Sequence, residues 1–226
     1  MKHVLIPQIA HHAIKAFFTL KTVGTETKTI SEMVSIEEER IILPIQKHTD
    51  TVQIIEDTMQ AEIADAVVTA KKNVLIGVQT ADCVPILLFD KEKQVIGAVH
   101  AGWRGTAKGI IKKTLGVMHE KFRSSYEDIF AALGPSIRWN CYSVGPEVKE
   151  AVSRATGKGT YYRKNKGGTY SLDLSSANVT QMISLGIPER NIWISGECTF
   201  CNPERYYSYR YTKSYEGNQG GFIGIV

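Results

Sequence analysis

Short runs of apolar residues, separated by polar segments, recur along the chain. The runs are rich in Val and Ile and too short for helices, so they predict buried β-strands. The predicted strands are Val74–Val78, Val84–Phe89, Val95–Val99, Ile129–Leu133 and Ile192–Ser195.

Longer segments between these runs carry apolar residues at helical spacing. In the segment 105–122, the positions that fall on one helical face are Ile111, Leu115, Met118 and Phe122. Strands mixed with helices predict an α/β (α+β) architecture. No repeat and no Pro/Gly/Ser-rich linker divides the chain, so residues 1–226 are expected to form a single domain.

Two further helices are indicated by their end signals. One is expected over 145–156, starting after Gly145 with Pro146 in its first turn. The other is expected over 175–187, with Ser175 as its N-cap and Gly186 as its end.

The composition is that of an ordinary globular protein, with 43% hydrophobic and 22% charged residues. A net charge of +4, spread along the chain, predicts no nucleic-acid partner. No apolar run approaches the ~18 residues of a membrane span, and no signal-peptide pattern opens the chain. Four cysteines are too few for a disulfide scaffold. A cytoplasmic, reduced protein without a membrane partner is expected.

The polar segment "DKEKQ" connects two of the predicted strands as a hairpin loop would. With Phe89 opposite Val95, Val84 falls opposite His100. Cys83 and His100 are therefore expected to be neighbours at one edge of the sheet. This register points their side chains to opposite faces, and a bulge or a one-residue change in the turn would bring them to the same face.

A neighbouring thiol and imidazole allow three interpretations: a pair of metal ligands, a Cys–His catalytic pair, or a buried thiol beside a core histidine. A metal site needs a third ligand, and His48, between two apolar segments in "LPIQKHTDTV", is the candidate. The set His48, Cys83 and His100 would leave a fourth position open, as catalytic zinc sites do. The remaining histidines are expected to be solvated: His3, His11, His12 and His119.

Cys198 and Cys201 form a CxxC in "CTFC". The spacing suits zinc or redox chemistry, but the sequence shows no second CxxC or matched histidine after it. A structural or incidental role is predicted.

Four segments together resemble the signature blocks of the laccase-domain, or polyphenol-oxidase-like, proteins of the YlmD/YfiH type. They are "TADCVPILLFD", "VIGAVHAGWRGTAKGI", "LGPSIRWNCYSVGPEV" and "GECTFCNPERYYSYR", and the resemblance runs from about Gln46 to Arg210. It implies the laccase-domain fold and a metal ion, zinc or alternatively copper, bound by two histidines and one cysteine. Those ligands map onto His48, Cys83 and His100.

The resemblance also implies an activity. Such proteins are purine nucleoside phosphorylases, so the expected substrates are phosphate with adenosine, inosine, guanosine or S-methyl-5'-thioadenosine. The expected products are the free base and ribose-1-phosphate, and an adenosine deaminase side activity is implied as well.

Phosphorolysis requires a cationic site for phosphate and a donor for the departing purine. Arg104, in the glycine-bracketed "GWRGTAKG", is predicted to contact phosphate, with Arg210 as a second cation. Asp82 is predicted to act as a general acid or base, or to orient His100. Ser136 in "LGPSI" is predicted to face the pocket.

Other functions remain open on the sequence. One is a copper-dependent polyphenol oxidase, although Met118 and Met182 sit in ordinary helical positions rather than where an axial copper ligand is expected. Another is a hydrolase with Cys83 as nucleophile and His100 as base. The last is a non-catalytic metal-binding protein of cell-wall metabolism.

Overall fold

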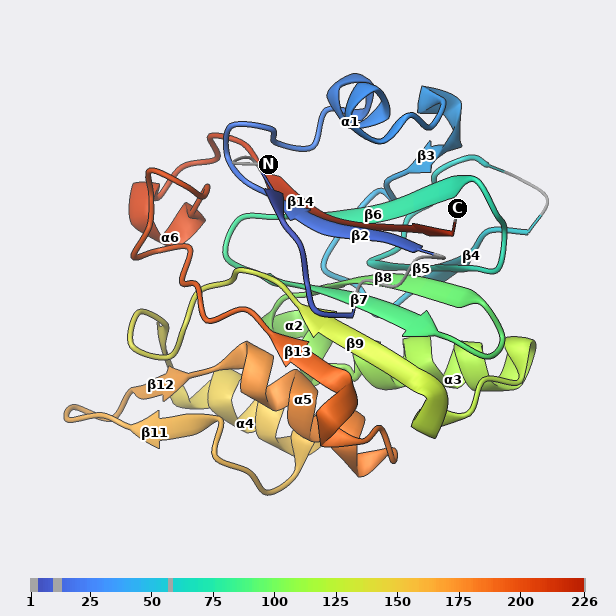
Figure 1. Cartoon of the computed structure of the whole chain (residues 1–226). Helices are drawn as coiled ribbons and strands as arrows, with labels where there is room; N and C mark the ends of the chain where they lie inside the picture. Colours follow the sequence, from blue (N-terminus) through green and yellow to red (C-terminus); the bar gives the residue numbers. More distant parts are fainter. Residues whose placement is uncertain (1–3, 10–13, 57–58, 226) are drawn as a thin grey trace.

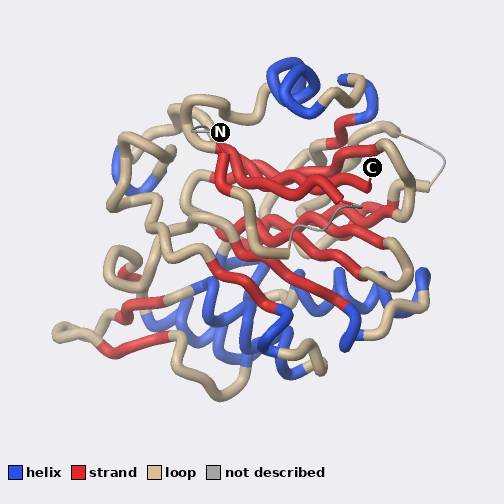
Figure 2. The backbone as a smooth tube through the Cα atoms, viewed as in Figure 1, coloured by secondary structure: helices blue, strands red, loops and turns tan. Residues whose placement is uncertain are grey.

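The computed structural model describes residues 4–9, 14–56 and 59–225, which form two stacked β-sheets with helices on both outer faces (Figures 1 and 2). Helix α1 (Thr27–Val34) packs on the outer face of a five-stranded sheet. A six-stranded sheet lies beneath it, and α2 (Trp103–Ala107), α3 (Ile110–Phe122), α4 (Pro146–Thr156) and α5 (Leu174–Ser184) lie on its far side. The short helix α6 spans Tyr209–Thr212.

The six-stranded sheet has the order β13-β9-β7-β8-β5-β4. Its strands are β4 (Val52–Ile54), β5 (Ala66–Thr69), β7 (Val84–Asp90), β8 (Val95–Ala101), β9 (Ile129–Leu133) and β13 (Ile192–Ile194). Alternate residues of β7 enter different cores: Ile86 packs toward the helices, and Leu87 packs toward the other sheet. Because both faces are covered, the strand reads as a continuous apolar run.

The five-stranded sheet has the order β1-β2-β14-β6-β3. It contains β1 (Val4–Leu5), β2 (Ile14–Thr19), β3 (Ile41–Ile42), β6 (Val74–Thr80) and β14 (Gln219–Ile225). Strand β14 lies between β2 and β6 and pairs antiparallel with both. Gly220 and Thr19 add a side-chain bond across this pairing, in which the Gly220 N–H donates to the Thr19 hydroxyl over 2.8 Å.

A small three-stranded sheet of order β10-β12-β11 flanks the helices. Its strands are β10 (Ser143–Val144), β11 (Tyr162–Lys164) and β12 (Tyr170–Leu172). Single 3₁₀ turns occupy Glu38–Arg40, Tyr126–Asp128 and Glu189–Asn191. Among the described residues, no helix combines the length and apolar character that crossing a bilayer requires.

The α/β architecture and all five predicted strands are confirmed, whereas the helix predicted over 105–122 is two helices. The break lies at Gly109, which adopts a left-handed conformation with φ of 73°. Glycine enters this region without the steric cost of a Cβ. Arg104 lies within the first of these helices, α2.

The helix over 145–156 begins as predicted, with Gly145 as its cap and Pro146 as its first residue. The predicted N-cap of the last long helix was wrong. Helix α5 begins at Leu174, and its cap is Asp173, whose carboxylate accepts the N–H of Ser176 over 3.0 Å.

The hairpin of β7 and β8 differs by one residue from the predicted register. Asp90, not Phe89, lies opposite Val95, so His100 falls opposite Pro85. The cause lies in the turn. The Asp90 carboxylate accepts the N–H groups of Glu92 and Lys93 and closes a turn over 91–94. Cys83 stands two positions before Pro85, so the corrected register places Cys83 and His100 on the same face.

The contact between Gly134 and the sheet above it generates a stability prediction. A Cβ at position 134 would collide with the ring of Phe18 and lie 2.8 Å from Pro85 Cγ. We expect Gly134→Ala to lower the free energy of unfolding by about 1–3 kcal/mol. Gly116→Ala in α3 is the control, because its Cβ meets nothing within 4 Å. That variant should gain about 0.5–1 kcal/mol from helix propensity. Equal effects of the two substitutions in chemical denaturation would contradict this account.

Candidate metal centre

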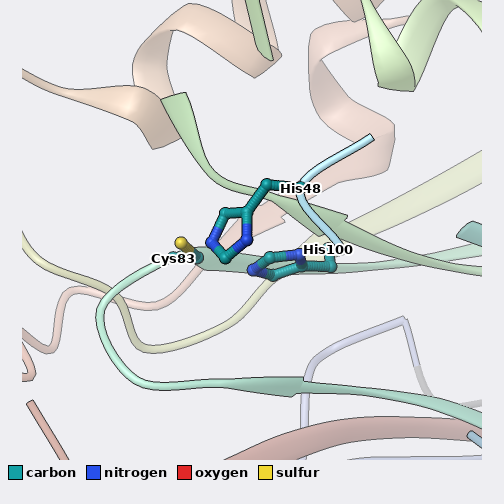
Figure 3. Close-up of side chains that lie close together, drawn as sticks. All are labelled: His48, Cys83 and His100. Carbon is teal, nitrogen blue, oxygen red and sulfur yellow. The ribbon is translucent and has the colours of Figure 1, made fainter. Parts of the chain in front are cut away.

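The structure brings His48, Cys83 and His100 together at one end of the hairpin (Figure 3). Cys83 directly precedes β7, His100 is the penultimate residue of β8, and His48 comes from the connection between β3 and β4. One ligand atom from each side chain lies within 4.8 Å of the other two. The two imidazole rings meet edge to face at 77°, with centroids 4.9 Å apart.

Asp65, just before β5, fixes both histidines. Its Oδ1 lies 2.7 Å from His100 Nδ1, and the same oxygen accepts the His48 N–H over 3.1 Å. Its Oδ2 accepts the N–H groups of Lys47 and Thr49 and the Thr49 hydroxyl. These bonds hold His48 in a left-handed backbone conformation with φ of 56°. Because Nδ1 of His100 is engaged by Asp65, Nε2 is its available ligand atom.

The charges at the centre keep Cys83 and Asp65 ionised. Burial lowers the pKa of His100, but the Cys83 and Asp65 charges and hydrogen bonds raise it to about 9, so a metal ion would displace the His100 proton on binding. Burial alone would raise the pKa of Cys83, but the charge on His100 and hydrogen bonds from both imidazoles lower it to about 6. The thiolate is therefore the main form of Cys83 at neutral pH, and thiolate is the form that binds metals. Burial raises the pKa of Asp65, yet its hydrogen bonds to His100 and Thr49 bring it well below the usual range. The Asp65 carboxylate thus remains charged.

The donor set fits a single borderline or soft metal ion. Two imidazoles and a thiolate are the ligands that zinc and copper prefer over Mg²⁺ or Ca²⁺. Close packing around the sulfur also depends on Gly102, where a Cβ would lie 2.8 Å from Cys83 Sγ and 3.3 Å from His48 Cδ2. Three protein ligands leave a coordination position for a reactant, which is the arrangement of catalytic rather than structural zinc sites.

The three side chains line a cavity of about 790 Å³, a size typical of small-molecule sites. Both predicted cations, Arg104 and Arg210, line the same cavity, as does Trp103, over which the Arg104 guanidinium lies 4.5 Å from the ring centroid. The Arg210 guanidinium lies 5.2 Å from the ring centroid of Tyr142, another lining residue.

Asp82 also lines the cavity, and its carboxylate holds two groups other than His100. Its Oδ1 accepts the Thr199 hydroxyl over 2.6 Å, and its Oδ2 accepts the Arg210 N–H over 2.7 Å. The carboxylate that orients His100 is Asp65 instead. Asp82 therefore connects the hairpin to the segment that carries Arg210.

The structure does not place Ser136 in the cavity wall. Its side chain is fully buried, and its hydroxyl lies 3.0 Å from that of Ser175. Among the other histidines, His119 is exposed and pairs through Nδ1 with the Ser124 carbonyl. The remaining three lie outside the described residues: His3, His11 and His12.

Sequence reasoning missed Asp65 and Tyr142. Burial and the nearby charges of Cys83 and Asp82 raise the pKa of Tyr142 to about 12, and the positive charges of Arg210 and Arg104 only partly oppose them. Tyr142 therefore keeps its hydroxyl proton at neutral pH and is a hydrogen-bond donor. Its position directly after Cys141, in "NCYSVG", is the sequence feature that could have indicated it as a site residue.

Comparison with known proteins identifies the family of this chain and several named relatives. A family model described as multi-copper polyphenol oxidoreductase laccase matches residues 19–226. A purine nucleoside phosphorylase of Aquifex aeolicus is 44% identical over 179 residues, which is 79% of this chain and 80% of the relative. Adenosine deaminase RL5, from an unknown prokaryotic organism, is 34% identical over 80% of this chain and 74% of its own.

The fold is similar to that of a solved relative. The crystal structure of YlmD from Geobacillus stearothermophilus superposes with a TM-score of 0.90 at 26% identity. The match covers 99% of this chain and 96% of that structure.

The Asp65 contacts predict its effect on metal affinity. Asp65→Asn removes the charge that holds both histidines, so we expect Zn²⁺ affinity to fall by about 10–100-fold, as changes to such outer-shell partners do. Competition with a chromophoric chelator would measure it. Asp50→Asn is the matched control, since Asp50 pairs with the exposed Lys108 and Lys113 at the surface. Such surface pairs contribute about 0–1 kcal/mol. Equal losses of affinity in the two variants would contradict the role given to Asp65.

Proposed function

The chain belongs to the multi-copper polyphenol oxidoreductase laccase family, and from this premise we propose that it is a zinc-dependent purine nucleoside phosphorylase. The supporting observation is one cavity that contains a His–Cys–His donor set and two arginines. Relatives named purine nucleoside phosphorylase supply the reaction class. The proposed substrates are phosphate and adenosine, inosine, guanosine or S-methyl-5'-thioadenosine.

In the proposed reaction a phosphate oxygen forms a bond to C1' of the ribose as the bond from C1' to the purine nitrogen breaks. The bonding electrons pass to the purine, which takes up a proton, and the products are ribose-1-phosphate and the free base. Arg104 and Arg210 hold the phosphate, because a guanidinium matches its oxygens in both geometry and charge. Both guanidiniums line the cavity, and that of Arg210 lies 5.2 Å from the ring centroid of Tyr142.

The remaining cavity residues orient the nucleoside. Tyr142 offers a hydroxyl proton to the substrate, since its raised pKa keeps it protonated. Trp103 presents an aromatic surface on which a base can stack. Asp82 acts as a positioning residue, because its carboxylate holds the backbone of Arg210. Loss of Asp82 would therefore weaken phosphate binding through Arg210.

His48, Cys83 and His100 would hold the metal at the cavity wall. When bound there, zinc supplies a Lewis acid that polarises a substrate oxygen or lowers the pKa of water. We also propose an adenosine deaminase side activity, which a relative named adenosine deaminase supports. Asp65 keeps the His100 imidazole oriented in both reactions.

Zinc is proposed over copper because of the surroundings of the donor set. A blue-copper centre adds a weak axial ligand, most often Met, to a His₂Cys set. Met118 and Met182 are fully buried in the core beneath the helices, and of the described residues no methionine lines the cavity. An electron-transfer centre is therefore less well supported than a hydrolytic or group-transfer one.

The metal proposal predicts that bound metal and activity are lost together. We expect His48→Ala, Cys83→Ala and His100→Ala each to lower the bound zinc at this centre and to abolish release of ribose-1-phosphate from inosine. Elemental analysis and a phosphorolysis assay would measure the two effects. If Cys83→Ala lost activity but kept its metal, the Cys–His hydrolase alternative would be favoured instead.

The phosphate proposal predicts a selective defect. Arg104→Ala should raise the KM for phosphate by about 10-fold or more, because a charge-assisted contact contributes about 1.5–3 kcal/mol. The bound metal should remain. Lys108→Ala is the matched control, because Lys108 ends the same helix outside the cavity lining and pairs with the surface residue Asp50. Loss of metal in Arg104→Ala, or an equal effect of both variants on KM, would refute the assigned role.

A further inference from the structure

Three cysteines outside the catalytic cavity converge on one another. Cys141 lies in the turn before β10, whereas Cys198 and Cys201 lie in the loop after β13. The Sγ atoms of Cys141 and Cys201 are 3.2 Å apart, and one ligand atom of each of the three residues lies within 4.8 Å of the others. All are free thiols. The CxxC therefore has a matched third ligand, which the sequence concealed because it lies 60 positions earlier.

The sulfur of Cys198 has the surroundings of a metal-bound thiolate. It accepts the N–H of Arg138 over 3.4 Å. Burial raises the pKa of Cys198, but the N–H groups of Arg138, Cys201 and Phe200 lower it below its usual value. By contrast, burial and the neighbouring thiols raise the pKa of Cys141 to about 12. A divalent cation bound to these sulfurs would displace the proton of the Cys141 thiol and separate the crowded sulfur atoms.

The sulfur spacing favours a metal over a disulfide. With Zn–S bonds of ~2.3 Å, tetrahedral geometry places ligand sulfurs ~3.8 Å apart. The separation of 3.2 Å between Cys141 and Cys201 would need to open by about half an ångström. A disulfide, with an S–S bond of ~2.05 Å, would need them to approach by more than one ångström. A disulfide would also leave without a role Cys198, whose sulfur lies within 4.8 Å of the other two.

We propose that Cys141, Cys198 and Cys201 form a second metal site that binds Zn²⁺ through three thiolates. Cys201 is exposed, so solvent completes the fourth coordination position. The ion would join two loops that contact the catalytic cavity through Tyr142, which lines it, and through Asp82, another lining residue. Tyr142 follows Cys141 in the first loop, and Thr199 in the second holds the Asp82 carboxylate. The role of the ion in this proposal is to hold the two loops together, and it does not depend on the reaction proposed above.

A pair of matched serine variants tests the site. Cys201→Ser removes one ligand of the second site at an exposed position, and Cys83→Ser makes the same substitution at the first. Each protein is purified with a thiol reductant, depleted of metal and titrated with Zn²⁺ against a chromophoric chelator. We expect two Zn²⁺ per wild-type chain and one per chain in each variant. Cys201→Ser should lose affinity at its site by more than about 100-fold, beyond what outer-shell changes produce.

The spectrum of the remaining ion assigns the site. Cd²⁺ added to Cys83→Ser should give intense thiolate-to-metal charge-transfer absorption from three sulfurs, and the further substitution Cys141→Ser should reduce it. If Cys201→Ser bound no Zn²⁺ while Cys83→Ser bound one, the second site would stand and the His–Cys–His centre would fail. Absence of Zn²⁺ binding by Cys83→Ser would overturn the proposal. A Cys141–Cys201 disulfide that persists in protein purified with the thiol reductant would overturn it as well.

Discussion

Asp65 carries its carboxylate in a fully buried position, where an unpaired charge would cost several kcal/mol. Three backbone N–H groups, one hydroxyl and the His100 imidazole satisfy that charge. The same bonds hold the loop of His48 and the ring of His100. The geometry of the metal centre therefore follows from the hydrogen bonds that the buried Asp65 carboxylate requires. Lys47 contributes an N–H group, and Thr49 an N–H group and a hydroxyl, that bond to the Asp65 carboxylate. These bonds give a defined shape to a loop of ordinary composition.

The sequence predicted the central strands well because both faces of the six-stranded sheet are covered. Covered strands are continuously apolar, and Ile129–Leu133 matched to the residue. The hairpin register was wrong by one position, because Asp90 counts as a polar loop residue by hydropathy but ends the strand and starts the turn. That single position determines whether Cys83 and His100 share a face. Hydrophobic pattern therefore located the centre, and side-chain hydrogen bonding in the turn determined its geometry.

Residues that act through distant partners could not be predicted. Asp65 precedes an apolar strand without any local signal, and its partner His100 lies 35 positions away. Ser136 was assigned to the pocket from its turn-like context, but its pairing with Ser175 became visible only in three dimensions. Gly109 is a local signal for a helix break, but the helical spacing of the apolar residues that follow it indicated one continuous helix. Long-range pairing, rather than weak local pattern, accounts for most of these errors.

The position of β14 has a consequence for the folding pathway. This strand fills the space between β2 and β6, and its bond from Gly220 to Thr19 spans 201 positions. Closing so long a loop costs chain entropy before the pairing stabilises anything, which slows folding of proteins with high contact order. Until β14 docks, β2 and β6 expose unpaired edges of the kind that promote self-association. We therefore expect docking of β14 to be a late step, and the period before it to be when the chain is most prone to aggregate.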